Sequence, residues 1–303
     1  MKIINTEYFD IQRKIVANMT TESWETVPHV GYVYEPDATA FLEEYEKLKA
    51  STDVKITLNT LVLKALTEGL KAAPMLNSHI YFKRNLVKGK IVQFEDINIS
   101  MPMLLPDGKM MTINVHDFHN KSLTEMTEYI NDVRRRMEKT NLTEVMFEVS
   151  MANTLEALKK LKLKTVICRL IGAKLGKHRV KTLTGKAKKD YYSIPESDRL
   201  TYRDIEQGTI TISNIGSLYR NQRGISTLLE IIPPQVCAIA IGAVWEKPVV
   251  IKDENGNKDI EARKILPINI AFDHRAADFG DVVPFFEKLD EIFENPQVIK
   301  DWI

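Results

Sequence analysis

The sequence of 303 residues is poor in the signals that mark several common classes of protein. It holds only two cysteines, Cys168 and Cys237, and both stand in apolar surroundings, which predicts buried thiols rather than a disulfide framework. The N-terminus lacks an apolar signal core, and no stretch approaches the roughly 20 apolar residues that span a bilayer. These absences favour a cytoplasmic location.

The motifs of several enzyme classes are missing as well. The chain has no glycine-rich phosphate loop of the Walker or dinucleotide type, no HExxH, no paired CxxC and no GxSxG. Their absence argues against kinases, dehydrogenases, zinc hydrolases and α/β-hydrolases. His116 and His119 form the only close pair among six histidines, and their spacing in a loop is weak for metal binding. We therefore expect no metal.

The residues that are present predict an α+β protein. Hydrophobic residues make up 44% of the chain, enough for a proper core, and the net charge of +1 gives no global attraction to nucleic acid or membrane. Periodicity predicts helices at 11–23, 38–50, 57–73, 122–133, 145–158 and 281–293, and strands at 28–34, 208–213, 235–244 and 265–272, with a sheet region at 80–113. No internal boundary is evident, which predicts a single domain over residues 1–303 with a large mixed sheet.

The most informative stretch lies near the C-terminus. An apolar strand, LPINIAF, leads directly into Asp273-His274-Arg275-Ala276-Ala277-Asp278-Phe279-Gly280. A buried strand that ends at a histidine, with a carboxylate four residues on, can hold one imidazole still for proton transfer. The stretch favours acyl transfer, and a solvated His-Arg loop is an alternative of equal weight from these residues alone.

Two further stretches join this motif: GTITISNIG at residues 208–216 and IPPQVCAIAIG at residues 232–242. Together with DHRAAD they resemble the catalytic domain of the 2-oxo acid dehydrogenase acyltransferases, the E2 components, which share a fold with chloramphenicol acetyltransferase. The N-terminal segments RKIVANM, VPHV, KAL and PMLN agree with this resemblance, which covers roughly residues 10–140 and 203–303. The resemblance implies a chloramphenicol acetyltransferase-like fold, with a mixed sheet and flanking helices.

The resemblance also implies roles for four residues. His274 matches the general base that removes the proton of the attacking thiol, since a neutral imidazole has a pKa near the working pH. Ser213 matches the donor to the tetrahedral oxyanion; alone, a hydroxyl at a strand end more often satisfies a backbone group. Asp278 matches a carboxylate that pairs with an N-terminal arginine, here Arg13, and braces the histidine loop. An ordinary arginine on a solvated helix face is the competing interpretation of Arg13.

The implied reaction moves an acyl group between a coenzyme A-type thioester and a second thiol of the dihydrolipoyl kind, without a covalent enzyme intermediate. It implies a homotrimer with the active site between subunits, coenzyme A as acyl carrier, and a separate lipoyl domain or acyl carrier protein as partner. One alternative keeps the mechanism but uses a hydroxyl or amine acceptor on a small molecule or lipid. Another is an inactive trimeric scaffold or membrane-associated module. The residues that bind coenzyme A are not identified by the sequence.

The chain departs from the family pattern in three places. Phe279 follows Asp278 where the family has glycine, which puts the turn into the last helix in doubt. The sequence shows neither a lipoyl domain nor a peripheral subunit-binding domain. A basic insertion at about 141–200 falls outside the resemblance, and from Lys159 to Lys189 it holds twelve Lys or Arg and no Asp or Glu.

Several functions fit this basic insertion. It can be a solvated surface excursion, a cradle for phosphate groups on coenzyme A or a carrier protein, or an interfacial membrane helix on an anionic surface. The membrane alternative rests on apolar residues interleaved with lysines: Leu161, Leu163, Val166, Ile167, Leu170 and Ile171. Nucleic acid is disfavoured, because the basic run lacks aromatic residues for base stacking.

Overall fold

The computed structural model describes residues 1–104, 108, 110–159, 161, 163–222, 224–252 and 255–303. Contacts divide the chain into two compact units, residues 1–21 with 131–207 and residues 22–130 with 208–303. The single domain over residues 1–303 stays a prediction. The basic insertion predicted at about 141–200 belongs to the first unit.

The first unit is helical. Its elements are α5 (Leu142–Lys159), α6 (Leu163–Lys174), η4 (Gly176–His178), α7 (Gly185–Tyr192), η5 (Glu196–Asp198) and α8 (Tyr202–Ile205), with parts of α1 (Ile11–Thr26) and α4 (Leu123–Glu138). A little-exposed ion pair joins α4 to α8, where Arg136 Nη1 lies 2.8 Å from Asp204 Oδ1. The same carboxylate accepts hydrogen bonds from the backbone and side chain of Thr201, so the polar groups at this helix junction are satisfied.

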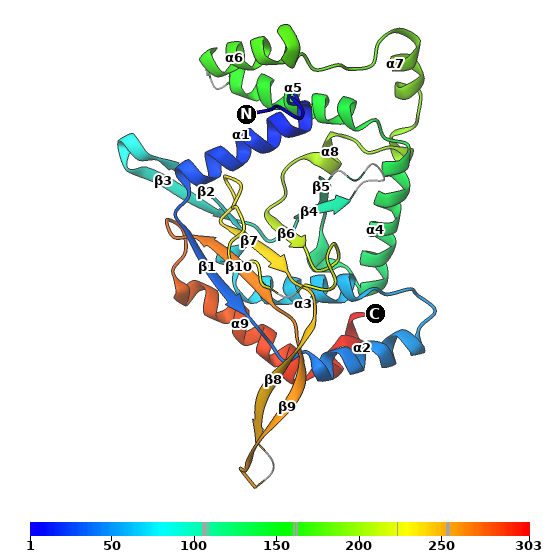
Figure 1. Cartoon of the computed structure of the whole chain (residues 1–303), viewed down its shortest axis with the longest axis vertical. Coiled ribbons are helices and arrows are strands. Elements are labelled where there is room, and N and C mark those ends of the chain that lie inside the picture. Colours follow the sequence, from blue (N-terminus) through cyan, green and yellow to red (C-terminus); the bar gives the residue numbers. More distant parts are fainter. Residues whose placement is uncertain (105–107, 109, 160, 162, 223, 253–254) are drawn as a thin grey trace. The chain divides into compact units, whose positions relative to one another are not determined.

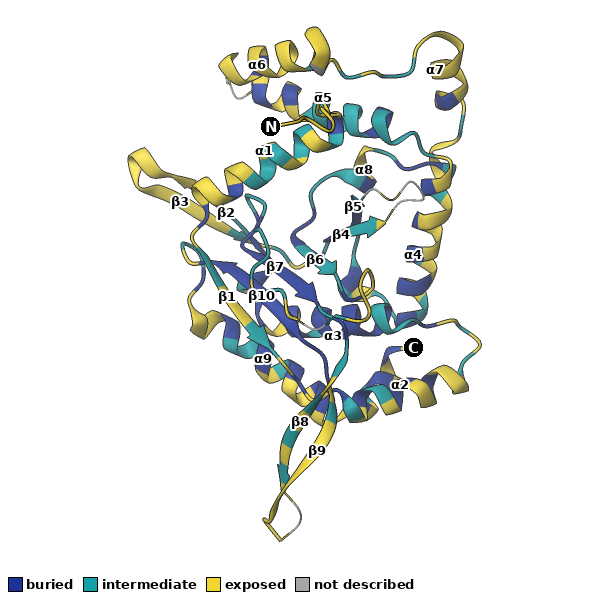
Figure 2. Ribbon diagram, in the orientation of Figure 1, coloured by how far each residue is buried: buried dark blue, intermediate teal, exposed yellow. Residues whose placement is uncertain are grey.

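The second unit is built on a six-stranded mixed sheet (Figure 1). Its order is β1 (His29–Tyr34), β10 (Ile268–Asp273), β7 (Cys237–Ile241), β6 (Ile210–Asn214), β4 (Ile99–Leu104) and β5 (Met110–Val115). The pairs β7–β6 and β6–β4 are parallel, and the other three pairs are antiparallel. The predicted mixed sheet is thus confirmed, and the central strands β7 and β10 are buried along their whole length (Figure 2).

Helices and two separate hairpins complete this unit. The hairpins are β2 (Ser78–Lys83) with β3 (Lys88–Gln93) and β8 (Trp245–Lys252) with β9 (Lys258–Ile265). The helices are α2 (Thr39–Ser51), α3 (Leu58–Ala72) and α9 (Phe279–Glu294), with short turns η1 (Pro74–Leu76), η2 (Arg84–Leu86), η3 (Phe118–Asn120) and η6 (Pro296–Trp302). The β8–β9 hairpin was not predicted from the sequence.

Helix α9 and a loop segment contact opposite faces of this sheet. The rings of Tyr32 and Tyr34 in β1 lie 4.9 and 5.3 Å from that of Phe286 in α9. Side chains alternate along a strand, so the intervening residues of β1 face the other side. On that side the loop residues Leu228 and Leu229 pack on a core cluster that includes Ala238 of β7 and Ala271 of β10.

The two cysteines differ in their surroundings. Cys237 lies fully buried in β7, where desolvation raises the pKa of its thiol. Cys168 in α6 is exposed, so the prediction of a buried thiol was wrong there. The reason is that α6 buries few of its apolar side chains, among them Val166. No helix in the described ranges is long and apolar enough to cross a membrane.

Candidate active site

The backbone of His274 is fixed by strand β10. This strand is paired on both edges, with β1 and β7, and Asp273 at its end lies opposite His29. The backbone N–H of His274 donates to the carbonyl of Pro28 at 3.0 Å. This bond extends the β1–β10 pairing by one residue beyond the pair His29–Asp273. The histidine therefore leaves the sheet from a rigid point.

A buried carboxylate closes the turn that carries this histidine. Asp273 has no exposed surface, and its Oδ2 lies 2.6 Å from Nη2 of Arg275. Its Oδ1 accepts from Nε and from the backbone N–H of Arg275, at 3.0 and 2.9 Å. Its carbonyl accepts from the backbone N–H groups of Ala276 and Ala277. The side chain of Asp273 thus stabilises the loop from within. The sequence did not predict this role, although an Asp side chain often accepts a hydrogen bond from the backbone N–H two residues later.

The imidazole of His274 faces Asp278. Nδ1 of His274 lies 3.3 Å from Oδ1 of Asp278, and the two side chains are 55% and 83% exposed. A neutral imidazole that directs Nδ1–H to this carboxylate keeps its lone pair on Nε2. An exposed histidine in this form can accept a proton from an incoming substrate.

Phe279 does not disrupt the turn into α9. It is the first residue of the helix, and its ring lies 5.3 Å from that of Tyr32 and 6.0 Å from that of Phe286. Asp281 Oδ2 accepts from the backbone N–H of Asp278 at 2.8 Å, which caps the helix start. A Cβ at Gly280 would meet no atom within 4 Å, so this turn has no steric need for glycine there.

Arg13, the predicted partner of Asp278, is exposed on α1 in the first unit. Its backbone N–H donates to Oδ1 of Asp10 at 2.8 Å. Asp278 belongs to the second unit. The pairing of Arg13 with Asp278 therefore stays a prediction.

Ser213 lies in β6, between two glycines that allow close packing. A Cβ at Gly208 would approach the carbonyl oxygen of Asn98 to 2.3 Å, and one at Gly216 would approach the backbone of Gly242 to 2.4 Å. Ser213 is half-buried, and no other described residue hydrogen-bonds its hydroxyl. The hydroxyl is therefore available to a ligand.

Ser213 and His274 are well separated within one chain. The sheet register places Ser213 opposite Ala240, and Ala240 opposite Asn269. Asn269 precedes the end of β10 by four residues, about 13 Å of extended strand. His274 must reach the attacking thiol, and Ser213 must reach the oxygen of the carbonyl that this thiol attacks, so the two groups must lie close to one another. One chain alone therefore does not assemble the predicted pair.

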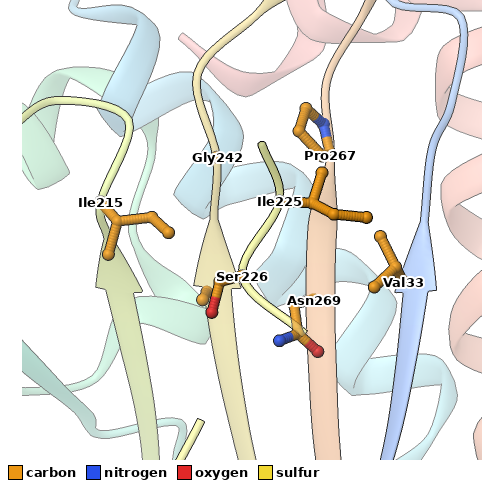
Figure 3. A pocket seen from close by; sticks show the side chains of 8 residues that line it. Val33, Ile215, Ile225, Ser226, Gly242, Pro267 and Asn269 are labelled. Atoms are coloured by element: carbon orange, nitrogen blue, oxygen red, sulfur yellow. The ribbon is translucent and has the colours of Figure 1, made fainter. Parts of the chain in front are cut away.

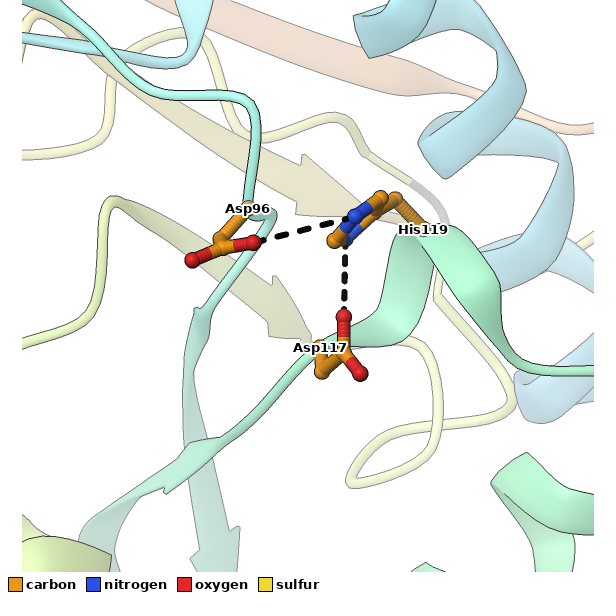
Figure 4. Close-up of side chains that lie close together, drawn as sticks. All are labelled: Asp96, Asp117 and His119. Atoms are coloured by element: carbon orange, nitrogen blue, oxygen red, sulfur yellow. Dashed lines mark ion pairs between the residues drawn. The ribbon is translucent and has the colours of Figure 1, made fainter.

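A second polar cluster holds His119, one member of the histidine pair at 116 and 119. Potential ligand atoms of Asp96, Asp117 and His119 lie within 4.8 Å of one another. Nδ1 of His119 is 3.2 Å from Asp117 Oδ1, and Nε2 is 3.8 Å from Asp96 Oδ1 (Figure 4). The backbone N–H of Ile97 also donates to Nδ1, and Lys121 Nζ lies 3.8 Å from Asp117 Oδ2. These protein contacts account for the cluster, and we assign it no metal chemistry.

Comparison with protein families gives one extensive match. The model of the family "2-oxoacid dehydrogenases acyltransferase (catalytic domain)" matches residues 4–153 and 180–300. The resemblance predicted from the three motifs is confirmed. The unmatched stretch, residues 154–179, is shorter than the insertion predicted at about 141–200.

Individual relatives agree with this match. The chain is 24% identical over 288 residues to the dihydrolipoyllysine-residue acetyltransferase component of the pyruvate dehydrogenase complex of Mycoplasma pneumoniae, covering 93% of this chain and 54% of that protein. It is 24% identical over 298 residues to the corresponding protein of Staphylococcus aureus, covering 97% of this chain and 52% of that protein. The chain thus spans about half the length of these curated relatives.

Solved structures show the same fold. A probable dihydrolipoamide acetyltransferase from Listeria monocytogenes superposes with a TM-score of 0.64 at 19% identity, covering 96% of this chain and 94% of that one. The cubic core of the pyruvate dehydrogenase multienzyme complex gives 0.64 at 18% identity, covering 99% and 94%. The predicted α+β acyltransferase fold, a mixed sheet with flanking helices, is confirmed.

Proposed function

The chain belongs to the acyltransferase catalytic-domain family of the 2-oxoacid dehydrogenases, and from this premise we propose that it moves an acyl group between a coenzyme A-type thioester and a dihydrolipoyl-like thiol. The observation that carries the proposal is His274, an exposed imidazole fixed at the end of a buried strand with Nδ1 at Asp278. Coenzyme A enters the reaction as a substrate.

Each proposed step uses a residue of this chain. Nε2 of His274 removes the proton of the attacking thiol, and the sulfur attacks the thioester carbonyl. The hydroxyl of Ser213 donates to the oxyanion of the tetrahedral intermediate. When the intermediate collapses, its carbon–sulfur bond to the first thiol breaks, and the departing thiolate takes the proton back from the imidazolium. Neither enzyme residue is acylated.

The separation of Ser213 from His274 supports a site shared between copies of the chain. A closed homotrimer would place His274 of one subunit opposite Ser213 of the next, three times over. The solved cubic core shows that a protein of this fold builds a larger assembly. Asp278 positions His274 in this proposal, and Arg13 is a candidate for holding Asp278.

The thiol acceptor distinguishes this proposal from its rivals. Its partner would be a lipoyl group on a separate domain, because the curated relatives named above are dihydrolipoyllysine-residue acetyltransferases. An acyl carrier protein would offer the same thiol chemistry. A hydroxyl or amine acceptor would use the same His274 and Ser213 with a different nucleophile.

The direct experiment measures acyl transfer from acetyl-CoA to free dihydrolipoamide by the purified chain. We expect thioester formation that falls by about two to four orders of magnitude in His274→Ala, while His116→Ala, a control histidine with no role in the reaction, retains its rate. Acyl transfer to alcohols or amines, with no transfer to dihydrolipoamide, would show that the acceptor is a hydroxyl or amine and not a thiol. A transfer rate that His274→Ala leaves unchanged would reject the mechanism.

The basic insertion suggests a separate partner, an anionic membrane surface. Helix α6 is exposed along most of its length (Figure 2). The side chains of Leu163, Ile167 and Ile171 are 55%, 56% and 52% exposed, whereas Val166 is buried. Residues 159–189 carry twelve Lys or Arg and no Asp or Glu. Two of the twelve, Lys160 and Lys162, lie outside the residues that the structure describes. An exposed apolar face among lysines suits the headgroup region of anionic lipid.

Flotation with phosphatidylserine-containing vesicles tests this partner. We expect salt-sensitive binding that Ile167→Ser with Ile171→Ser abolishes. Val250→Ser with Ile260→Ser, which changes two even more exposed apolar residues of the β8–β9 hairpin, should leave this binding intact. Absence of binding by the unmodified chain would refute the proposal. A change of oligomeric size in the α6 variant would show that this face contacts another subunit.

A further inference from the structure

The hairpin formed by β2 and β3 carries an excess of positive charge. Residues 78–93 contain four Lys or Arg and no Asp or Glu, and residues 81–91 are exposed without interruption. Lys83 lies directly opposite Lys88, and Lys90 extends to the same face because side chains alternate along a strand. Like charges directly opposite one another destabilise a strand pair. The stability of the hairpin therefore does not explain these lysines.

The rest of the chain does not balance this charge. Among the described residues, no acidic side chain forms an ion pair with Lys83, Arg84 or Lys88. Lys90 instead lies over the ring of Tyr81, with Nζ 5.6 Å from the ring centroid. The basic side chains of the hairpin are therefore available to a partner of opposite charge.

The turn of this hairpin presents apolar side chains to solvent. Leu86 and Val87 are 60% and 81% exposed. Val87 has a φ of 46°, in the left-handed region that a β-branched side chain disfavours and that glycine adopts freely. An exposed valine in a strained conformation contributes little to the fold. Contact with another molecule gives this side chain a role.

The hairpin begins at the end of the sheet where His274 lies. The backbone N–H of Val236 donates to the carbonyl of Ser78 at 3.1 Å, and the carbonyl of Val236 accepts from the backbone N–H of Asp273 at 2.8 Å. Ser78 and Asp273 are thus two strand spacings apart, about 10 Å. Strand β2 is antiparallel to the segment before β7, so it runs in the direction of β10 and continues past the end of that strand (Figure 1).

Two features at the other end of the sheet lack this excess of charge. A small hollow at the start of β10 is lined by Val33, Pro267 and Asn269 among others, and none of its lining residues is charged (Figure 3). The β8–β9 hairpin follows the far end of β7, and residues 245–265 carry five Lys or Arg and five Asp or Glu. Neither feature offers an anionic partner a net positive surface.

We propose that the β2–β3 hairpin docks the acidic surface of the domain that carries the dihydrolipoyl thiol to His274. This inference rests on the proposed acyl transfer. Carboxylates of the domain pair with the four basic residues of the hairpin, and apolar side chains of the domain contact its turn.

The distance from the hairpin to His274 favours a protein-borne thiol over a small one. Lys83 lies five residues beyond Ser78, about 17 Å of extended strand. A small free thiol at His274 does not reach charges so far away, whereas a folded domain does. The dihydrolipoyl group ends a long flexible side chain, so a domain on the hairpin is able to present its thiol at the imidazole.

The test compares two acceptors with acetyl-CoA as donor: free dihydrolipoamide and a reduced lipoyl domain of net negative charge. In Lys83→Glu with Lys88→Glu, we expect kcat/KM for the domain to fall by about tenfold or more at low ionic strength, because charge steering accelerates association by that order. Transfer to free dihydrolipoamide should stay nearly unchanged. The matched control is Lys252→Glu with Lys258→Glu, a directly opposed and exposed pair in the β8–β9 hairpin, which should leave both activities intact.

Val87→Gly provides a second variant that does not depend on charge reversal. Glycine adopts the left-handed conformation without strain, so this variant should be at least as stable as the unmodified chain in thermal unfolding. Because it also removes the apolar side chain at the turn, KM for the lipoyl domain should rise. A more stable chain with weaker use of the domain would not be expected from a purely structural role of Val87.

The outcomes separate this inference from the proposed function. Equal kcat/KM for the domain in the unmodified chain and both hairpin variants would overturn the inference alone, as would transfer to free dihydrolipoamide with none to the domain. Absence of transfer to either acceptor would overturn the proposed function, and the inference with it. If the charge-reversed hairpin kept its activity with the domain but lost binding to phosphatidylserine-containing vesicles, or changed its oligomeric mass, the hairpin would belong to a lipid or subunit contact instead.

Discussion

Ser213 lies on β6 in line with the start of β10, whereas His274 lies just beyond the far end of that strand. The ladder from Ser213 through Ala240 to Asn269 fixes this offset, and about 13 Å of strand separates Asn269 from Asp273. The two groups that the proposed chemistry requires thus come from different parts of one sheet. A second copy of the chain is the simplest way to bring them together.

The Asp273–Arg275 pair should matter more for stability than any other contact of the histidine loop. In Arg275→Met the carboxylate of Asp273, which has no exposed surface, loses its cation, and we expect a loss of about 3 kcal/mol in the free energy of unfolding. Urea unfolding measures it. Arg84→Met, at an exposed site, should change stability little. Equal stability of the two variants would show that the pair does not brace the loop.

Asp278 should affect rate more than stability. Its side chain is 83% exposed, so Asp278→Asn removes little packing but takes the charge away from Nδ1 of His274. We expect kcat for acyl transfer to fall by about tenfold or more, with KM and the unfolding midpoint nearly unchanged. The pH profile of kcat should shift as well. A variant that loses stability but keeps kcat would instead give Asp278 the bracing role predicted from the sequence.

His79 should make stability depend on pH. Burial lowers the pKa of this histidine, although the carbonyl of Gly208 near Nε2 acts in the opposite direction. In the unfolded chain this histidine has a pKa of about 6.5, so below that pH the unfolded chain binds a proton that the folded chain does not bind. The free energy of unfolding should therefore decrease as the pH falls below about 6.5.

The variant His79→Phe tests this assignment, because a phenyl ring can keep the contact with Phe94, whose ring lies 4.7 Å away. Thermal unfolding midpoints measured on both sides of pH 6.5 should fall less with acid in the variant than in the unmodified chain. Parallel decreases in the two proteins would assign the pH dependence to other groups.

The sequence predicted the elements whose pattern is local. The helix that starts after Ser122 shows the expected capping box, with Ser122 N–H donating to Glu125 and Glu125 N–H to Ser122. The β8–β9 hairpin was missed because β9, KDIEARKI, is exposed along most of its length and lacks an apolar alternation. A helix in the α6 region was only one of several alternatives for the basic insertion, and the structure shows both the helix and Val166 as the buried member of its apolar set.

The candidate site was predictable only in part, for a physical reason. His274 follows from a buried strand and a motif, both of which lie in contiguous residues. The offset between Ser213 and His274 depends on strand register across β6, β7 and β10, which no single segment encodes. Asn269 stands in an apolar run of the sequence. Only the arrangement of the neighbouring strands shows that its side-chain Oδ1 and Nδ2 have no hydrogen-bond partner among the described residues.

The measurement that tests the central claim most directly is activity in mixed assemblies of His274→Ala and Ser213→Ala chains. Each variant alone should transfer acyl groups from acetyl-CoA to dihydrolipoamide at least about a hundredfold more slowly than the unmodified chain. After co-expression, random trimers contain sites that pair an intact His274 with an intact Ser213 of the next subunit, and turnover should recover to about a quarter of the unmodified rate. A mixture no more active than the separate variants would contradict a site shared between subunits.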